Sequence, residues 1–195
     1  IPDDTGRWQR VLALTGSDEP FAVAHLPKLL PKGDYHRCPD SSATLHADHL
    51  LLGWGLGAYR FERYLAATES PRLHSEGHGE PALAMLDASL RVRDWINLPT
   101  EDMGPEQLQS AVFDAALAFN AKAEAIIGDD LLQQNFPTIH AVGRASHRAP
   151  RLLRLDWGDA AHPHVVLCGK GVCFDTGGLD IKTADGMRNM KKDMG

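Results

Sequence analysis

Cysteine is scarce in this sequence, and long apolar runs are missing. The three cysteines, Cys38, Cys168 and Cys173, form neither a zinc-type pair nor an even set for disulfides, which favours a reducing, cytoplasmic compartment. No run approaches the roughly 18 consecutive apolar residues of a membrane-spanning helix. No signal-peptide pattern occurs either, but the chain opens at Ile1 rather than at methionine, so we expect the true N-terminus to be missing.

An excess of positive charge is also missing. The net charge of -6 and the isoelectric point near 5.9 argue against nucleic acid or an anionic membrane as a default partner. At 195 residues, with 43% hydrophobic and 24% charged residues, the chain is of a globular type with room for one domain and part of another. It contains no internal repeats and no low-complexity segments.

The most informative stretch lies toward the C-terminal end. Residues 169–178 read Gly-Lys-Gly-Val-Cys-Phe-Asp-Thr-Gly-Gly and follow the apolar run 165–167, which predicts a short buried strand. Two lysines and two aspartates stand in and after this stretch, at Lys170, Asp175, Lys182 and Asp193. Glycines permit positive φ and close approach of a ligand, and clustered carboxylates attract hard divalent cations. We interpret the stretch as a metal-and-substrate loop at the carboxyl end of a strand.

Two other interpretations of this stretch were weighed. Lysines and aspartates usually form a solvated face, but Lys170 and Asp175 are embedded among apolar residues and glycines. A phosphate-binding P-loop requires a glycine five positions before its Gly-Lys pair and a Ser or Thr directly after the lysine. Here His164 occupies the first position and Gly171 the second, so phosphate binding is not expected.

Residues 169–178 resemble the Gly-Lys-Gly-x-x-Phe-Asp-Ser/Thr-Gly-Gly segment of the leucine aminopeptidases, the cytosolic dinuclear-metal aminopeptidases of the M17 type. The match continues at the family's spacing through Lys182 to residues 190–195. Residues 97–105, Asn-Leu-Pro-Thr-Glu-Asp-Met-Gly-Pro, resemble the opening of the family's catalytic domain, whereas the resemblance is weak before about Pro81.

The resemblance implies a role for each matching residue. Lys170, Asp175 and Asp193 match metal ligands, and Asp175 is similar to a carboxylate that touches both metals. Lys182 matches the lysine that polarises the scissile carbonyl, and Met190 matches a residue lining the pocket for the substrate's first side chain. The chemistry agrees, because a lysine ligates a metal only as a neutral amine, whereas Lys182 must stay protonated where negative charge develops.

The resemblance further implies an aminopeptidase that releases N-terminal, preferentially apolar, leucine-type residues from peptides through a metal-activated hydroxide. It implies two divalent ions, manganese or zinc with magnesium or cobalt as alternatives, a bicarbonate in the full-length protein, and a homo-hexamer.

The family completes its site with a later Asn-Thr-Asp-Ala-Glu-Gly-Arg segment, which supplies an Asp, a Glu and the Arg that holds the bicarbonate. This sequence contains no such segment. We therefore expect the 195-residue chain to be inactive alone and its full-length parent to be active. A non-catalytic binding or assembly module that retains the fold is the alternative.

The alternation of predicted elements favours an α/β fold. We expect a small N-terminal α/β domain at 1–78, a linker helix at 79–96, and the first part of a catalytic domain, a mixed sheet with flanking helices, at 97–195. Within this last part the patterns predict a helix from Pro105, strands at 122–127, 138–142 and 152–157, and a short helix that ends near Gln134.

For the N-terminal part the patterns predict a strand at 10–14, helices at 21–30 and 59–67, and a strandless linker at 70–79. Residues 53–58 fit a dinucleotide-binding glycine pattern, but no acid-ended strand follows at the required distance, so we interpret the glycines as close packing in a turn. Residues 46–49, His-Ala-Asp-His, lack the glutamate of a zinc-binding helix and favour surface or helix-cap histidines.

Overall fold

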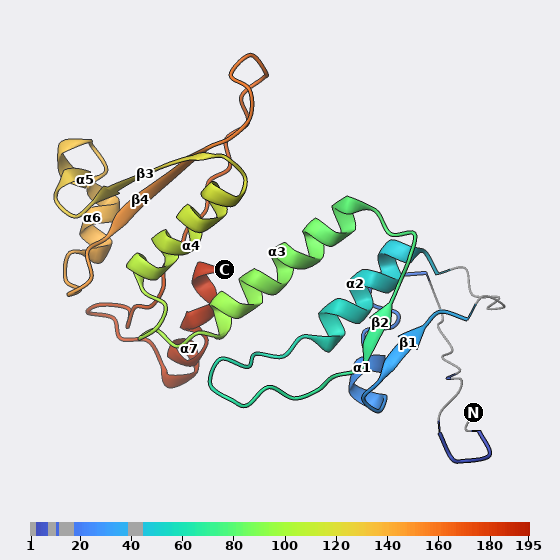
Figure 1. Ribbon diagram of the computed structural model, residues 1–195. Coiled ribbons are helices and arrows are strands. Elements are labelled where there is room, and N and C mark those ends of the chain that lie inside the picture. The colour runs from blue at the N-terminus through green and yellow to red at the C-terminus, as the bar shows by residue number, and fades with distance from the viewer. Residues whose placement is uncertain (1–2, 8–10, 12–17, 39–44) are drawn as a thin grey trace. The chain divides into compact units, whose positions relative to one another are not determined.

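A computed structural model describes residues 3–7, 11, 18–38 and 45–195 (Figure 1). The chain divides into two compact units, Ile1–Asp94 and Trp95–Gly195. Each unit combines helices with a two-stranded sheet, which confirms the predicted α/β class. The strand predicted at 10–14 falls, except for residue 11, outside the described residues. None of the helices in the described part is long and apolar enough to cross a membrane.

The sheet of the first unit is a short parallel pair. Strand β1 (Asp34–His36) pairs with β2 (Arg72–His74), in a register that sets Asp34 opposite Arg72. The expectation that 70–79 contains no strand was therefore wrong. Three residues are too few for an alternating pattern to be recognised, and only the pairing with β1 defines β2 as a strand.

Helix α2 (Ala47–Ala58) contains the glycines that we had assigned to a turn. A side chain on Gly57 would collide with the backbone carbonyl of Ala24, so the predicted close packing is confirmed but occurs in a helix. The helix begins after His46, whose ring nitrogen accepts a hydrogen bond from the Asp48 N–H at 3.3 Å, as the cap interpretation predicted. The helix predicted at 59–67 is wrong, because α2 ends at Ala58.

The core of the first unit is formed by Val23, Leu45 and Leu50. Helix α1 (Leu26–Leu29) is shorter than the predicted 21–30 because Pro27 lies in its first turn, where a proline can begin a helix but cannot continue one. Helix α3 (Glu80–Asn97) follows the predicted helix at 79–96 closely and ends before Leu98-Pro99, since a residue preceding proline disfavours helical backbone.

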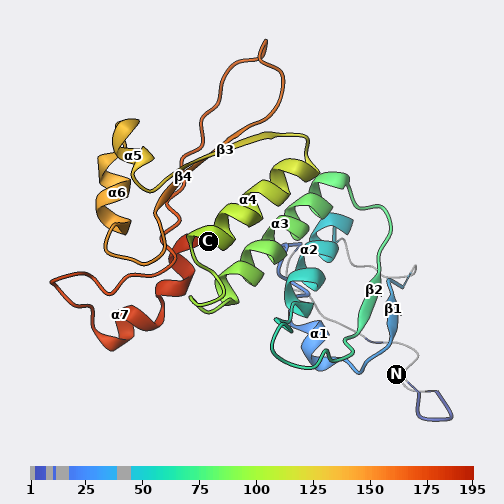
Figure 2. The ribbon, with the colours of Figure 1, turned by 60° about the vertical axis from the view of Figure 1, so that its left-hand side comes forward.

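The second unit is built on an antiparallel pair, β3 (Lys122–Ile127) with β4 (Arg151–Asp156), whose register runs from Lys122 opposite Asp156 to Ile127 opposite Arg151. Helix α4 (Pro105–Ala118) packs beside this pair. The short helices α5 (Asp130–Gln133) and α6 (Pro137–Gly143) lie together at one end of it (Figures 1 and 2). The sequence predictions for α4, α5, β3 and β4 are confirmed.

Two predicted strands of this unit are wrong. Residues 138–142 form most of α6, because Pro137 occupies the first turn and presets helical φ there. Residues 165–167 form no strand, and their side chains are largely exposed, 92% in the case of Leu167. The segment after β4 leaves the pair as an extended loop in both views, and a strand needs a neighbour to complete its backbone hydrogen bonds.

Candidate functional site

The candidate site is a closed loop between Asp175 and Lys182. The Lys182 ammonium donates a hydrogen bond to Asp175 Oδ1 at 2.5 Å, and the Gly177 N–H donates to the same oxygen at 2.8 Å. The Lys182 backbone N–H also donates to the Thr176 carbonyl at 2.9 Å, which closes the loop at its base. Two of the residues that the sequence selected, seven positions apart, are thereby in direct contact.

Gly177 is the residue that allows this closure. Its φ of +96° lies in the left-handed region that side chains disfavour, and a side chain there would collide with the Asp180 carbonyl. Gly178 also has positive φ, +76°, but a side chain there would meet nothing within 4 Å. Both positions of the glycine pair therefore require a backbone conformation that favours glycine. Only Gly177 also requires the absence of a side chain, because of its close approach to Asp180.

The carboxylate of Asp175 is held in its charged form. The hydrogen bond from Lys182 lowers the pKa of Asp175 below its ordinary value and outweighs burial, which raises the pKa; the Gly177 N–H and the charges of Lys182 and Lys170 lower it further by smaller amounts. The Asp175 side chain is nevertheless 42% exposed. The structure therefore presents an ionised and accessible carboxylate whose Oδ1 is occupied by Lys182 and the Gly177 N–H.

Lys182 also contacts the third residue of the predicted set. Its Nζ lies 3.0 Å from Met190 Sδ, and Met190 is buried. Met190 opens a 3-10 helix (Met190–Met194) that follows α7 (Ala184–Arg188), whose first turn is capped by the Thr183 hydroxyl. The structure thus brings together Asp175, Lys182 and Met190.

The other two predicted ligands are less closely joined. Lys170 is exposed, and its connection to the loop is the effect of its charge on Asp175. Asp193 is half-buried within the 3-10 helix and forms an ion pair with its neighbour Lys192, whose Nζ lies 3.0 Å from Asp193 Oδ1.

The donor set fits one part of a metal site. Two carboxylates and one amine are oxygen and nitrogen donors of the kind that divalent transition metals accept. Among the described residues, no group of three or more His, Cys, Asp and Glu side chains is arranged to hold a metal ion. Lys170, Asp175 and Asp193 therefore stay a prediction as a ligand set.

The start of the loop rests on α4. A side chain on Gly171 would meet the end of the Leu108 side chain of α4, which shows how closely the loop approaches this helix, and Cys173 is buried two residues later. Burial raises the pKa of the Cys173 thiol, while the neighbouring charge of Arg148 lowers it to a smaller extent. Cys173 is thus a buried packing residue beside the loop, whereas Cys168 is exposed.

The three thiols should therefore differ in reactivity. We expect Ellman's reagent to modify Cys38 and Cys168 rapidly in the folded chain, and Cys173 at least about tenfold more slowly, because it is buried and its thiol is kept protonated. Stopped-flow absorbance would resolve the two classes, and the urea-unfolded chain, in which all three thiols react alike, is the control. Three equal rates in the folded chain would contradict the burial of Cys173.

Arg148 is a site-supporting residue that the sequence did not reveal. Its guanidinium donates to the carbonyls of Thr100 and Glu101, at 2.8 Å and 2.9 Å, and so holds the segment before α4. Arg151 reaches α4 itself, donating to Glu106 Oε1 at 2.5 Å. The positive charges of both arginines also lower the pKa of Cys173 against the larger effect of burial. No local pattern marks them, since Arg148 lies 48 positions from Thr100 along the chain.

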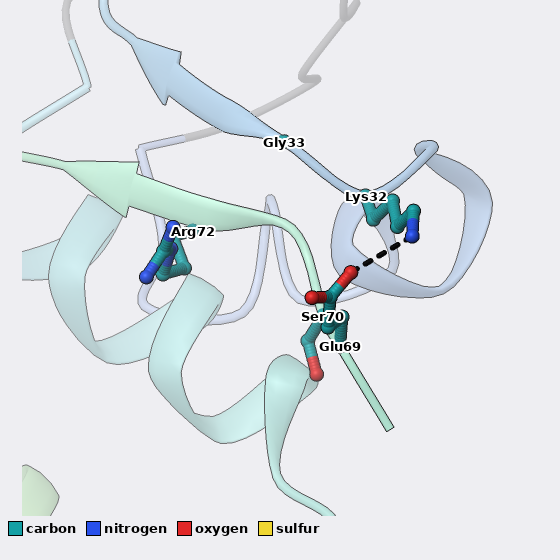
Figure 3. Close-up of a pocket in the computed structure, with 5 residues that line it drawn as sticks. All are labelled: Lys32, Gly33, Glu69, Ser70 and Arg72. Carbon is teal, nitrogen blue, oxygen red and sulfur yellow. Dashed lines mark hydrogen bonds and ion pairs between the residues drawn. The ribbon is translucent and has the colours of Figure 1, made fainter.

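A pocket in the first unit is a weaker candidate. It has a volume of about 460 Å³ and is lined by Lys32, Gly33, Glu69, Ser70 and Arg72 (Figure 3). Its charges are already paired: Lys32 Nζ lies 2.8 Å from Glu69 Oε2, and Arg72 Nε lies 3.2 Å from Asp34 Oδ1. A ligand there would have to displace an existing ion pair.

The fold agrees with known aminopeptidases. The cytosol aminopeptidase of Coxiella burnetii superposes on the whole chain with a TM-score of 0.90 and 42% identity, and the chain covers 43% of that protein. The bottromycin maturation enzyme BotP, solved in complex with Mn, shares the fold over 90% of this chain and 40% of its own, with a TM-score of 0.72 and 24% identity.

Sequence comparison identifies the family. Residues 91–195 match the catalytic domain of the cytosol aminopeptidase family, and residues 1–73 match the N-terminal domain of M17 aminopeptidases. The chain belongs to the cytosol aminopeptidase family. Peptidase B of Pectobacterium carotovorum is 47% identical over 113 residues, which are 53% of this chain, and the chain spans only 26% of that relative's length.

Proposed function

We propose that this chain is part of a metal-dependent aminopeptidase that releases N-terminal, preferentially apolar, leucine-type residues from peptides. The observation that carries the proposal is the contact between Asp175 and Lys182 in a glycine-closed loop, 2.5 Å between Oδ1 and Nζ, in a chain of the cytosol aminopeptidase family. A carboxylate and an ammonium side by side are the two kinds of group that peptide hydrolysis at a metal centre requires.

Lys170, Asp175 and Asp193 would hold two divalent ions together with ligands from the rest of the parent. Manganese or zinc suits such donors, with magnesium or cobalt as alternatives, and the related BotP is known in complex with Mn. Bound there, the ions would supply an activated water and an anchor for the peptide's free amine. We propose that a bicarbonate completes the site in the full-length protein.

The remaining roles belong to side chains of this chain. The Lys182 ammonium would donate a hydrogen bond to the oxygen of the scissile carbonyl as negative charge develops on it. Met190, buried and in contact with the Lys182 ammonium at 3.0 Å, would present an apolar wall to the first side chain of the peptide, which favours leucine-type residues. The same lysine would thus align the carbonyl beside the specificity pocket.

The organisation of the parent follows from the same resemblance. We propose an N-terminal domain at 1–78, a linker helix at 79–96 and the beginning of the catalytic domain at 97–195, in a protein that assembles as a homo-hexamer. A reducing, cytoplasmic compartment is supported by the three cysteines, all of which are free thiols.

The test compares hydrolysis of leucine p-nitroanilide by the 195-residue chain and by its full-length parent, each with Mn²⁺. We expect release of p-nitroaniline by the parent and none above background by the chain, because the chain offers only part of the ligand shell. A parent that stays inactive with Mn²⁺, Zn²⁺, Mg²⁺ and Co²⁺ would favour a non-catalytic binding module. An active chain would contradict the proposal that ligands outside it are needed.

A further inference from the structure

Asp175 and Lys182 are assigned to different partners in the proposed reaction, yet they bind each other here. Asp175 Oδ1 accepts hydrogen bonds from the Lys182 ammonium at 2.5 Å and from the Gly177 N–H at 2.8 Å. Oδ1, which accepts both hydrogen bonds, has little remaining capacity for a metal ion. The same ion pair holds the Lys182 ammonium at Asp175 and neutralises much of the charge that it would offer to a substrate carbonyl.

The ion pair is built into the loop. The Lys182 N–H donates to the Thr176 carbonyl at 2.9 Å, which fixes the backbone at both ends of the pair. The ammonium also lies 3.0 Å from Met190 Sδ, which is a weak acceptor and cannot replace the carboxylate. The Lys182 side chain is 31% exposed, so it has room to move away from Asp175 without unfolding the loop.

We propose that Lys182 is a placeholder cation, which occupies Asp175 until a divalent metal displaces it and is thereby released toward the substrate. This inference rests on the proposed function, since it assumes that Asp175 is a metal ligand. An ammonium and a divalent ion on one carboxylate repel each other, so the metal must displace the lysine. Binding of the metal and release of the Lys182 ammonium from Asp175 then occur together.

Thermodynamic linkage predicts whether removing the Lys182 ammonium strengthens or weakens metal binding. If metal binding must break the ion pair, then removing the ion pair must strengthen metal binding by the same free energy. A lysine that only assists the substrate would leave metal affinity unchanged, and a lysine that helps to arrange the ligands would weaken it when removed. The three possible roles of Lys182 therefore predict three different directions.

The experiment measures Mn²⁺ affinity by calorimetry in the 195-residue chain. Lys182→Met keeps the length and apolar stem of the side chain and removes its charge, and we expect it to bind Mn²⁺ at least about fivefold more tightly than the wild-type chain. Lys182→Arg keeps the charge and should stay near the wild-type affinity. Lys122→Met is the matched control, because it removes one positive charge from an exposed ion pair with Glu124 on β3 and should change nothing.

A second measurement follows the wild-type side chain directly. In lysine-selective ¹⁵N NMR, the Nζ signal of Lys182, assigned by its absence in Lys182→Arg, should have the slow proton exchange of an ion-paired ammonium. Addition of diamagnetic Zn²⁺ should move it to the position of the solvent-exposed lysines. A Lys182 signal with the exchange of free lysines before metal is added would overturn the placeholder role, whatever the variants do.

The outcomes separate the two proposals. Mn²⁺ binding by the wild-type chain with no gain in Lys182→Met would overturn the placeholder role and leave the aminopeptidase proposal intact. The absence of Mn²⁺ and Zn²⁺ binding in every variant of the chain and also in the full-length parent, with the ion-pair signal present, would instead contradict Asp175 as a metal ligand, and both proposals would fail.

Discussion

Replacing Lys182 by methionine in the full-length parent is expected to lower kcat for leucine p-nitroanilide by roughly 10²–10³-fold, the usual effect of removing one donor to a developing oxyanion. The substitution removes the ammonium whose Nζ lies 2.5 Å from Asp175 and 3.0 Å from Met190, and it retains the apolar stem. Because the lost interaction strengthens as the transition state forms, KM should change much less than kcat. Steady-state kinetics at saturating Mn²⁺ would measure both constants.

The parent carrying Lys122→Met is the control for this measurement, since Lys122 forms an exposed ion pair with Glu124 on β3 and takes no part in the proposed chemistry. It should retain the parent's kcat. A Lys182→Met parent whose kcat falls less than about threefold, or whose loss lies entirely in KM, would remove Lys182 from the transition state and leave it a role in binding alone.

The kinetic and calorimetric expectations for Lys182 point in opposite directions. The protein with Lys182→Met should bind Mn²⁺ more tightly and turn over substrate more slowly. A general loss of structure cannot produce this combination, because unfolding weakens both metal binding and turnover. It follows that metal occupancy alone is not a measure of activity in this family member if Lys182 has both roles. The tighter-binding variant would be the less active one.

The residues of the candidate site stand out in the sequence, although their roles stay predictions. Lys170, Asp175 and Lys182 are chemically unusual among glycines, and the structure places the last two in contact. Local signals of this kind depend on residue type and spacing, which the sequence displays directly. The position of Asp193, which forms an ion pair with Lys192, depends on packing at the 3-10 helix, and residue type and spacing alone do not predict it.

The wrongly predicted elements are segments whose residue composition favours one structure while their neighbours in the fold favour another. Residues 138–142 contain β-branched residues typical of a strand, but Pro137 and the packing of α6 against α5 favour a helix. Residues 165–167 have the composition of a buried strand, but a strand also requires a neighbour, and these residues are exposed in the structure. By contrast α4 and the β3–β4 pair were predicted well because their periodicity continues over six or more residues.

The paired glycines of the loop allow a prediction with an internal control. Gly177→Ala should weaken Mn²⁺ binding by the 195-residue chain at least about tenfold, equivalent to about 1.4 kcal/mol. The new methyl group would add a collision with the Asp180 carbonyl to the strain of a positive φ, +96° at this residue, and would move the N–H that positions the Asp175 carboxylate.

Gly178→Ala supplies the matched control, because its φ of +76° brings the same kind of backbone strain while its side chain would meet nothing within 4 Å. We expect it to change Mn²⁺ affinity less than about threefold, since strain of about 1 kcal/mol can be relieved in a loop with open space. Calorimetry on both variants isolates the contact with Asp180 from the shared effect of φ. Equal losses in the two variants would mean that backbone conformation alone, and not the close approach at Gly177, holds Asp175 in place.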